Sequence, residues 1–331
     1  MNRRYPLALT AAAGVVALRS RAKKPTLIPY VPPQPLPGRT RTVAAEDGVE
    51  LSVTEHGPAD AAVTFVLAHG YVQSSALWSG QVRDLVAARP DLKVVTYDHR
   101  GHGASGRTTP DTSTLEQLAR DLERVLDAVA PTGPVLLAGH SMGGMTIMAL
   151  AEHAPELFGE RVVGVAFVAT SSGQLDEVTW GLPPSLARLV KSVLPRLNEK
   201  ALRDQLKGKA RRTSPGEARL IFPKAADPAL VREALDVQRQ TRAETVAWFL
   251  PTFSRHDRLE VLKALEGLPV VVLVGDRDLL CPLPHSQALV GALPDAELVV
   301  YPGVGHMVQM ERRAGVSRQL LHLLDRVALK S

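Results

Sequence analysis

The chain has 331 residues and 45% hydrophobic content, which is enough for one large domain or two small ones with a sizeable core. Its net charge is +5, but its basic segments lack the interleaved aromatic residues that stack on bases, which argues against a nucleic-acid-binding module. A single cysteine, Cys281, excludes an internal disulfide and a multi-cysteine zinc site, and we expect it to be a small buried side chain.

Residues 1–40 are predicted to be an N-terminal arm outside the folded core. Residues 1–41 contain eight Lys or Arg and no acidic residue. The uncharged stretch 5–18 is shorter than the roughly 20 apolar residues that a membrane span needs, and the proline-rich stretch 28–38 is typical of a linker. The uncharged stretch 5–18 resembles a signal-peptide core, but basic residues follow it instead of a small-residue cleavage site. We expect a membrane-associating arm or, alternatively, a disordered or surface-packed N-terminus of a cytoplasmic protein.

The pattern from residue 41 onwards predicts a sheet with helices between its strands. Alternating residues around Asp47 and Gly48 indicate a hairpin. Continuous apolar runs then predict buried strands at 63–70, 93–98, 134–140, 162–170, 268–275 and 296–303. Helical spacing of apolar residues appears near 76–88 and at 115–129, 142–153 and 313–328. This alternation predicts an α/β fold with a doubly wound, mostly parallel sheet.

The long gap between the fourth and fifth of these strands predicts an inserted helical cap at 171–256, so that residues 41–170 and 257–331 form the core. The stretches 185–197, 229–241 and 259–267 have helical patterns, interrupted by GLPP and TSPG. Residues 171–256 contain fifteen Lys or Arg and nine Asp or Glu, which favours an anionic or membrane-borne substrate. Five apolar side chains could cover an acyl chain: Leu182, Leu186, Leu189, Val193 and Leu197.

The stretch GHSMGG at 139–144 puts Ser141 on the turn between a predicted strand and a predicted helix. Such a sharp turn needs small residues, because side chains at Gly139 or Gly143 would collide with the neighbouring strand or helix. The helix N-terminus that follows stabilises a nearby negative charge. The pattern suits a nucleophile in acyl transfer, although a serine N-cap in a glycine-rich loop has the same sequence form.

Polar residues follow the other predicted strands at their carboxyl ends, where function gathers in open α/β sheets. They include His69, Asp98, Asp276, Asp278 and His306. A nucleophilic serine needs a histidine as base and a carboxylate that orients the imidazole. The chain offers these three residue types at strand ends in the order serine, aspartate, histidine.

From about residue 41 to 331 the chain resembles the serine hydrolases of the α/β-hydrolase fold. Four stretches carry the resemblance: HGYVQSSALW at 69, YDHRGHGASG at 97, GHSMGG at 139, and GDRDLLCP at 275 with GVGHM at 303. The second stretch, YDHRGHGASG, is similar to the corresponding stretch of a subgroup that includes esterases, monoacylglycerol lipases, haloperoxidase-like perhydrolases without a cofactor, and C–C bond hydrolases.

The resemblance implies that Ser141 is the nucleophile, His306 the general base and then acid, and Asp278 the orienting carboxylate. Asp276 competes for the last role, but the family's G-x-x-D form, counted from Gly275, selects Asp278. The alternative for Asp276 is a turn residue.

The resemblance also implies an oxyanion hole made of the backbone N–H groups of Tyr71 and Met142. The side chains of Tyr71 and Trp78 could contact substrate or only pack in the wall of the site. His69 is expected to brace the oxyanion loop. The remaining polar residues of these stretches are interpreted as structural: Asp98, Arg100, His102 and Ser105 in a turn beside the site, and His140 next to the nucleophile.

The predicted function is hydrolysis of a small-molecule or lipid ester through an acyl-enzyme. The same triad could serve thioester hydrolysis, perhydrolysis or C–C bond cleavage, and a catalytically silent binding protein on this fold is a remote alternative. A serine at the turn excludes the dehalogenases and epoxide hydrolases of this fold, which attack with a carboxylate. The sequence has no metal-binding or nucleotide-binding motif, so no cofactor is expected.

Overall fold

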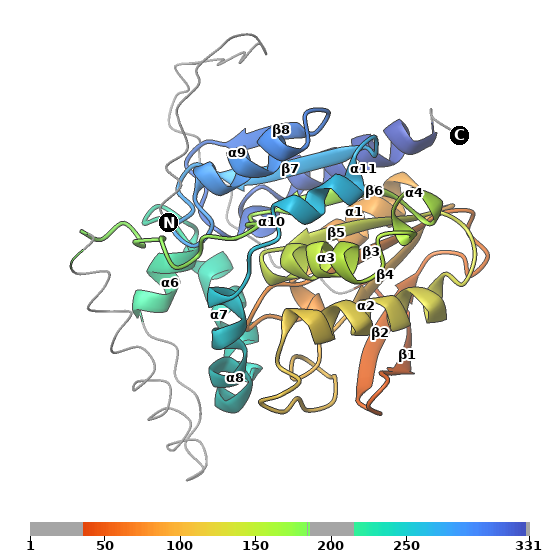
Figure 1. Ribbon diagram of the computed structural model, residues 1–331, viewed down its shortest axis with the longest axis horizontal. Helices are drawn as coiled ribbons and strands as arrows, with labels where there is room; N and C mark the ends of the chain where they lie inside the picture. Colours follow the sequence, from red (N-terminus) through yellow and green to blue (C-terminus); the bar gives the residue numbers. More distant parts are fainter. Residues whose placement is uncertain (1–35, 184, 186–214, 329–331) are drawn as a thin grey trace.

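The computed structural model describes residues 36–183, 185 and 215–328, which contain one eight-stranded sheet (Figure 1). The strand order is β1-β2-β4-β3-β5-β6-β7-β8. The strands are β1 (Arg39–Ala44), β2 (Glu50–His56), β3 (Thr64–Ala68), β4 (Lys93–Tyr97), β5 (Val135–His140), β6 (Val162–Val168), β7 (Val270–Gly275) and β8 (Glu297–Tyr301). Strands β3 to β8 are parallel, and β1 and β2 form the predicted hairpin. The doubly wound, mostly parallel α/β fold is therefore confirmed.

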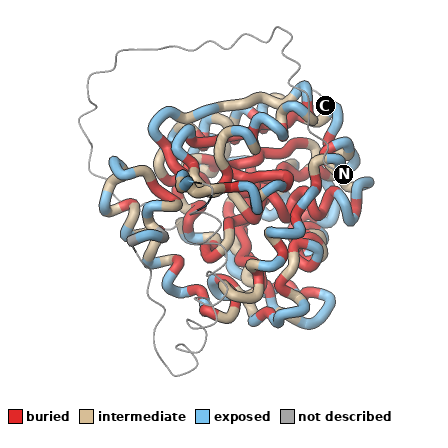
Figure 2. The backbone as a smooth tube through the Cα atoms, turned by 60° about the vertical axis from the view of Figure 1, so that its left-hand side comes forward, coloured by how far each residue is buried: buried red, intermediate tan, exposed pale blue. Residues whose placement is uncertain are grey.

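Helices cover both faces of this sheet. On one face lie α2 (Leu115–Val129), α3 (Met142–His153) and α9 (Leu283–Ala292), together with the 3-10 helix η2 (Glu260–Leu265). On the other lie α1 (Ser79–Ala88), which follows the 3-10 helix η1 (Ser75–Trp78), and α11 (Arg313–Ala328). Two short helices, α4 (Leu157–Glu160) and α10 (Val308–Glu311), complete the core. The central strands β3 to β7 are almost wholly buried between these layers, as the red tube in the middle of Figure 2 shows, whereas most residues of the edge strands β1 and β8 are exposed or half-buried.

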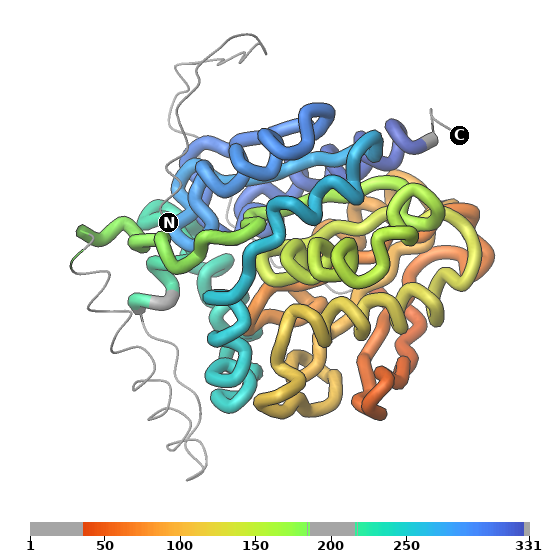
Figure 3. The backbone as a smooth tube through the Cα atoms, viewed as in Figure 1, coloured from red at the N-terminus to blue at the C-terminus, as the bar shows by residue number. Residues whose placement is uncertain are grey.

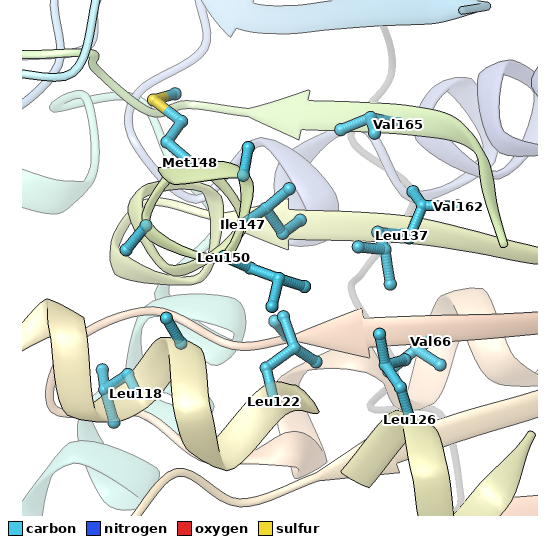
Figure 4. Packing of buried hydrophobic residues seen from close by; sticks show 14 of the residues in the cluster. Val66, Leu118, Leu122, Leu126, Leu137, Ile147, Met148, Leu150, Val162 and Val165 are labelled. Carbon is cyan, nitrogen blue, oxygen red and sulfur yellow. The ribbon is translucent and has the colours of Figure 1, made fainter. Parts of the chain in front are cut away.

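Aliphatic packing fixes the helix that follows Ser141 against the sheet. Figure 4 shows Ile147 and Leu150 of α3 next to Leu122 of α2, with Val66 and Leu137 of the sheet to their right. All five side chains are at most 1% exposed. Full burial of a side chain of this kind stabilises the fold by about 1.5–3 kcal/mol, so the N-terminus of α3 sits on a rigid support.

Three described helices of the connection between β6 and β7 lie beyond one end of the sheet (Figures 1 and 3). They are α6 (Pro215–Ile221), α7 (Pro228–Gln240) and α8 (Ala243–Ser254). The prediction at 229–241 corresponds to α7. The stretch TSPG was expected to interrupt the helical pattern of this segment. Helix α6, which was not predicted, begins at its Pro215, because proline is tolerated in the first turn of a helix. The helix predicted at 259–267 is the shorter η2.

Two predicted features lie outside the described residues. They are the N-terminal arm up to residue 35 and the helix at 185–197, of which only position 185 is described. The apolar residues Leu186, Leu189, Val193 and Leu197 fall in the same gap, whereas Leu182 is described and half-buried. Within the described ranges, the structure has no helix with the length and apolarity of a membrane span.

Candidate active site

Ser141 occupies a strained turn between β5 and α3. Its backbone has φ 51° and ψ −116°, a conformation that costs a residue with a Cβ on the order of 1–3 kcal/mol. The turn is compact because a Cβ on Gly139 would lie 2.4 Å from the main chain of Gly143, and a Cβ on Gly143 would lie 2.3 Å from a main-chain oxygen of β3. The requirement for glycine at both positions is confirmed. Among the described residues the Ser141 hydroxyl makes no hydrogen bond, and it is half-buried.

A buried histidine–carboxylate pair lies on the loops after β7 and β8. Nδ1 of His306 is 2.9 Å from Oδ2 of Asp278, and both side chains are at most 3% exposed. The other carboxylate oxygen, Oδ1, accepts hydrogen bonds from the backbone N–H groups of Leu280 and Cys281 at 2.8 and 3.0 Å. These three donors fix the carboxylate, which therefore holds the imidazole of His306 in one orientation.

Asp276, the competing carboxylate, has a different environment. It is exposed, and its Oδ1 accepts a hydrogen bond from the backbone N–H of Gly303 at 2.7 Å. This bond ties the loop after β7 to the loop after β8, as expected of a turn residue.

Tyr71 and Met142, whose backbone N–H groups were predicted to form an oxyanion hole, lie on two different elements. Tyr71 lies on the loop after β3, and Met142 is the first residue of α3, where amide groups lack partners within the helix. The phenol of Tyr71 donates a hydrogen bond to the carbonyl of Val246 in α8, and its ring packs edge-on against Phe253 at 5.1 Å. The side chain of Tyr71 thus fastens the loop after β3 to α8.

Trp78, by contrast, is a packing residue. It is 1% exposed and belongs to the apolar cluster on the α1 and α11 face of the sheet. Of the two aromatic residues that could contact substrate, only Tyr71 is partly exposed.

Three buried histidines brace the loops beside the site. His69 accepts a hydrogen bond from the backbone N–H of His99 at 3.0 Å through Nε2, and its Nδ1 donates to the carbonyl of Gly70 at 2.7 Å. His102 accepts at Nε2 from the N–H of Val72 at 3.2 Å. Burial lowers the pKa of all three imidazoles, to about 3 for His102. They are therefore neutral at physiological pH and act as fixed hydrogen-bonding groups, as expected for His69 and His102; no role had been predicted for His99.

The turn after β4 is also held as expected. Asp98 accepts hydrogen bonds from the backbone N–H groups of Ser75 and Ala104 at 2.7 and 2.8 Å, and Ser105 donates to the carbonyl of Asp98 at 2.6 Å. The guanidinium of Arg100 is wholly buried and forms ion pairs with the carboxylates of Asp47 and Asp121. This network joins the hairpin, the turn and α2 beneath the site.

Sequence reasoning missed three residues that hold the loop bearing His306. The carbonyl of Ile221, at the end of α6, accepts from the N–H of His306 at 2.9 Å. The carboxylate of Glu311 accepts from the N–H of Gly305 at 2.8 Å, and burial raises the pKa of Glu311 to about 7. The side-chain amide of Gln73 donates to the sulfur of Met307 at 3.3 Å. A main-chain acceptor such as Ile221 gives no sequence signal.

The described residues contain no group of three or more His, Cys, Asp or Glu that could hold a metal ion. Cys281 is buried, as predicted, and burial raises the pKa of its thiol. Burial of these histidines and of the Cys281 thiol leaves the half-buried hydroxyl of Ser141 as the candidate nucleophile of this site.

Comparison with known proteins agrees with this architecture. Residues 63–313 match the family model described as the alpha/beta hydrolase fold. A Caulobacter segnis protein that carries the name carbamate hydrolase RutD is 30% identical over 276 residues, covering 80% of this chain and 92% of the relative. Monoacylglycerol lipase of Mycolicibacterium smegmatis is 29% identical over 248 residues, covering 73% and 80% of the two chains.

Among solved structures, a thermophilic esterase from Thermogutta terrifontis matches with a TM-score of 0.70 and 23% identity, covering 87% of this chain and 99% of the esterase. At that identity the match shows the fold alone. The fold and the family match together define the class: the protein is a hydrolase. The chain belongs to the alpha/beta hydrolase fold family.

Proposed function

We propose that the protein cleaves carboxylic esters with Ser141 as nucleophile. The observation that carries the proposal is the geometry around this residue: a serine at positive φ at the start of α3, next to strand ends that hold the buried pair of His306 and Asp278. A family whose members carry esterase and lipase names supports it further.

The proton transfers follow from the hydrogen bonds of the pair. Nδ1 of His306 carries its proton toward Asp278, so Nε2 is the nitrogen that can accept the proton of the Ser141 hydroxyl. As Oγ of Ser141 bonds to the ester carbonyl carbon, that proton moves to Nε2. The ester C–O bond then breaks, His306 donates this proton to the departing alkoxide, and the acyl group stays on Ser141. Asp278 remains ionised and stabilises the imidazolium that forms between these steps.

Backbone amides would stabilise the oxyanion. We assign this role to the N–H groups of Tyr71 and Met142, and the N-terminus of the twelve-residue helix α3 adds a favourable field. Water then attacks the acyl-enzyme with His306 as general base, which releases the carboxylic acid and restores the Ser141 hydroxyl. No other group need enter the reaction.

The substrate class is a small-molecule or lipid ester. We propose that residues 171–256 act as a cap over the site, because Ile221 and Val246 of this segment contact the residues at which we assign base and oxyanion functions. Thioester hydrolysis, perhydrolysis and C–C cleavage use the same three side chains, and the choice between them depends on the pocket under the cap.

Ester hydrolysis is tested with p-nitrophenyl esters from acetate to palmitate, using wild type and Ser141→Ala in parallel. We expect turnover by the wild type that is lost in the variant, and the optimal chain length measures the acyl pocket. Turnover retained in Ser141→Ala would overturn the assignment of the nucleophile. If wild type is inactive on every ester, the ester proposal fails, and thioesters, peracid formation and C–C substrates are assayed next.

The basic arm supports a second, separate proposal, that residues 1–40 bring the enzyme to anionic membranes. Co-sedimentation with vesicles of phosphatidylglycerol and phosphatidylcholine compares the full chain with a variant that lacks residues 1–40. Equal sedimentation of the two would contradict this role and leave the cytoplasmic alternative.

A further inference from the structure

The imidazole of His140 lies between two loops of the site. His140 precedes Ser141 in the chain and is wholly buried. Its Nε2 is 2.9 Å from the main-chain oxygen of His306, and its Nδ1 is 3.1 Å from Oε1 of Gln73. The rings of His140 and His306 are 4.8 Å apart between centroids. One side chain thus reaches from the nucleophile turn to the loop of the base.

The contact at Nε2 has a defined direction. A main-chain carbonyl oxygen can only accept, so Nε2 of His140 must carry a proton and donate it. Burial keeps the pKa of His140 well below its ordinary value, so a single proton on Nε2 is the expected form. With its proton on Nε2, His140 has none on Nδ1 to donate to Oε1 of Gln73, so the approach at 3.1 Å is a packing contact, and the bond at Nε2 alone joins His140 to the loop of His306.

Gln73 extends the connection to the oxyanion loop. Its Oε1 also accepts from the backbone N–H of Gly70 at 3.3 Å, next to Tyr71 in the chain. The packing is tight, since a Cβ on Gly70 would lie 2.8 Å from Nδ1 of His140. His140 and Gln73 therefore link the loop of Tyr71, the turn of Ser141 and the loop of His306.

The bond to His140 differs from the other bonds that hold the loop of His306. The carbonyl of Ile221, the carboxylate of Glu311 and the N–H of Arg277 fasten this loop to α6, α10 and the loop after β7. His140 alone among these partners is covalently joined to Ser141. Its bond therefore sets the spacing between the two strand ends that carry the nucleophile and the base.

We propose that His140 is a positioning residue, whose Nε2–H holds the main chain of His306 at the distance that proton transfer from Ser141 requires. The inference rests on the proposed function, because it assigns a purpose to the spacing of these two residues. It also revises the interpretation of His140 as only structural, because a residue that merely filled space could be replaced by any side chain of similar volume.

Two amide substitutions separate positioning from packing. In His140→Gln the terminal amide nitrogen can occupy the place of Nε2 and keep the bond to His306. In His140→Asn the shorter amide reaches only the place of Nδ1, toward Gln73. His140→Leu fills the volume without the bond to His306, and His153→Gln, at the exposed far end of α3, is the matched control for a His-to-Gln change.

We expect His140→Gln to keep kcat on p-nitrophenyl butyrate within about threefold of wild type, while His140→Asn and His140→Leu lose about 100-fold, as a displacement near 1 Å costs. KM should change little in all of them, because His140 is buried and does not reach substrate. Thermal unfolding of every variant checks that losses in kcat occur in folded protein. Equal losses in the Gln and Asn variants, or losses that only follow the unfolding temperature, would overturn the proposal.

A second readout does not depend on turnover. The Nδ1–H of His306, hydrogen-bonded to Asp278, is expected to give a downfield proton NMR signal that His306→Gln removes. This signal should persist in His140→Gln and be lost by exchange with water in His140→Asn; the same spectrum in both variants would contradict positioning. If the wild type is inactive on every ester, the proposed function is wrong, while the NMR comparison still decides the role of His140.

Discussion

Replacing Asp278 by asparagine should inactivate the enzyme without unfolding it. In the wild type, Oδ1 of Asp278 accepts two backbone N–H groups at 2.8 and 3.0 Å, and Oδ2 accepts from His306 at 2.9 Å. The two backbone donors will hold the amide oxygen of the variant at the Oδ1 position. The NH2 group must then face Nδ1 of His306, and since two donors repel, the imidazole will carry its proton on Nε2.

An imidazole protonated on Nε2 cannot accept the proton of Ser141. The expected loss in kcat is about 10⁴-fold, the size of effect that a wrong histidine tautomer has in a Ser-His-Asp triad, and it corresponds to about 5 kcal/mol of activation free energy. Steady-state kinetics on p-nitrophenyl butyrate compare wild type with Asp278→Asn and with the control Asp276→Asn, which changes an exposed turn residue. A loss below tenfold in Asp278→Asn, or an equal loss in the control, would refute the reasoning.

Three further predictions concern the structure that supports the site. Gly143→Ala forces a Cβ to within 2.3 Å of a main-chain oxygen of β3 and should lower the free energy of unfolding in urea by about 3 kcal/mol, whereas unchanged stability would show that the turn can relax. Arg100→Met leaves the wholly buried carboxylate of Asp121 without its cation and should cost about 3–5 kcal/mol, most of which the double variant with Asp121→Leu should recover. Glu311→Gln tests the raised pKa of about 7: the folded state binds the proton of Glu311 more tightly than the unfolded state, so wild-type stability falls as pH rises from about 4.5 to 7. The Gln variant stays neutral and can still accept from Gly305, so the difference between its unfolding temperature and that of wild type should grow in its favour from pH 5 to about pH 7 and then level off, and a constant difference would contradict this.

The elements around Ser141 were predictable because each has a strong local signal. Helix α3 matches its predicted range to the residue, since a buried apolar run, a glycine-flanked turn and a helical pattern follow one another without a gap. Helix α2 also matches, because Thr114 caps its first turn by accepting from the N–H of Gln117 at 3.1 Å and its apolar face repeats every three to four residues.

Among the described helices that were missed, α8 and α9 are the longest, and both gave weak sequence signals. Helix α8 contains Pro251, which ordinarily ends a helix, but here it lies in the last turn, so that only three helical residues follow it. Helix α9 has apolar residues on all sides, so no period of 3.6 marks it. The stretch 259–267, by contrast, has a periodic apolar pattern that predicted a helix longer than the 3-10 helix η2. The helix is cut short because Gly267 adopts φ 78° and the chain then enters β7.

The chemistry-bearing side chains could be predicted because parallel strands bring their carboxyl ends to one edge of the sheet. This rule put Asp278 and His306 near each other, and the structure records their hydrogen bond across 28 positions of sequence. The same rule says nothing of the bond between His140 and the carbonyl of His306, which joins residues 166 positions apart. Such contacts depend on exact side-chain geometry, which sequence spacing does not determine.

The central claim is that Ser141 attacks a carbonyl, and covalent trapping tests it most directly. The folded protein is treated with diisopropyl fluorophosphate, and intact mass and peptide mapping locate the adduct while ester turnover is followed. The account predicts one adduct per chain, on Ser141, with turnover lost in proportion to labelling and no adduct in Ser141→Ala. An adduct on another residue, or turnover that persists in fully labelled protein, would contradict it.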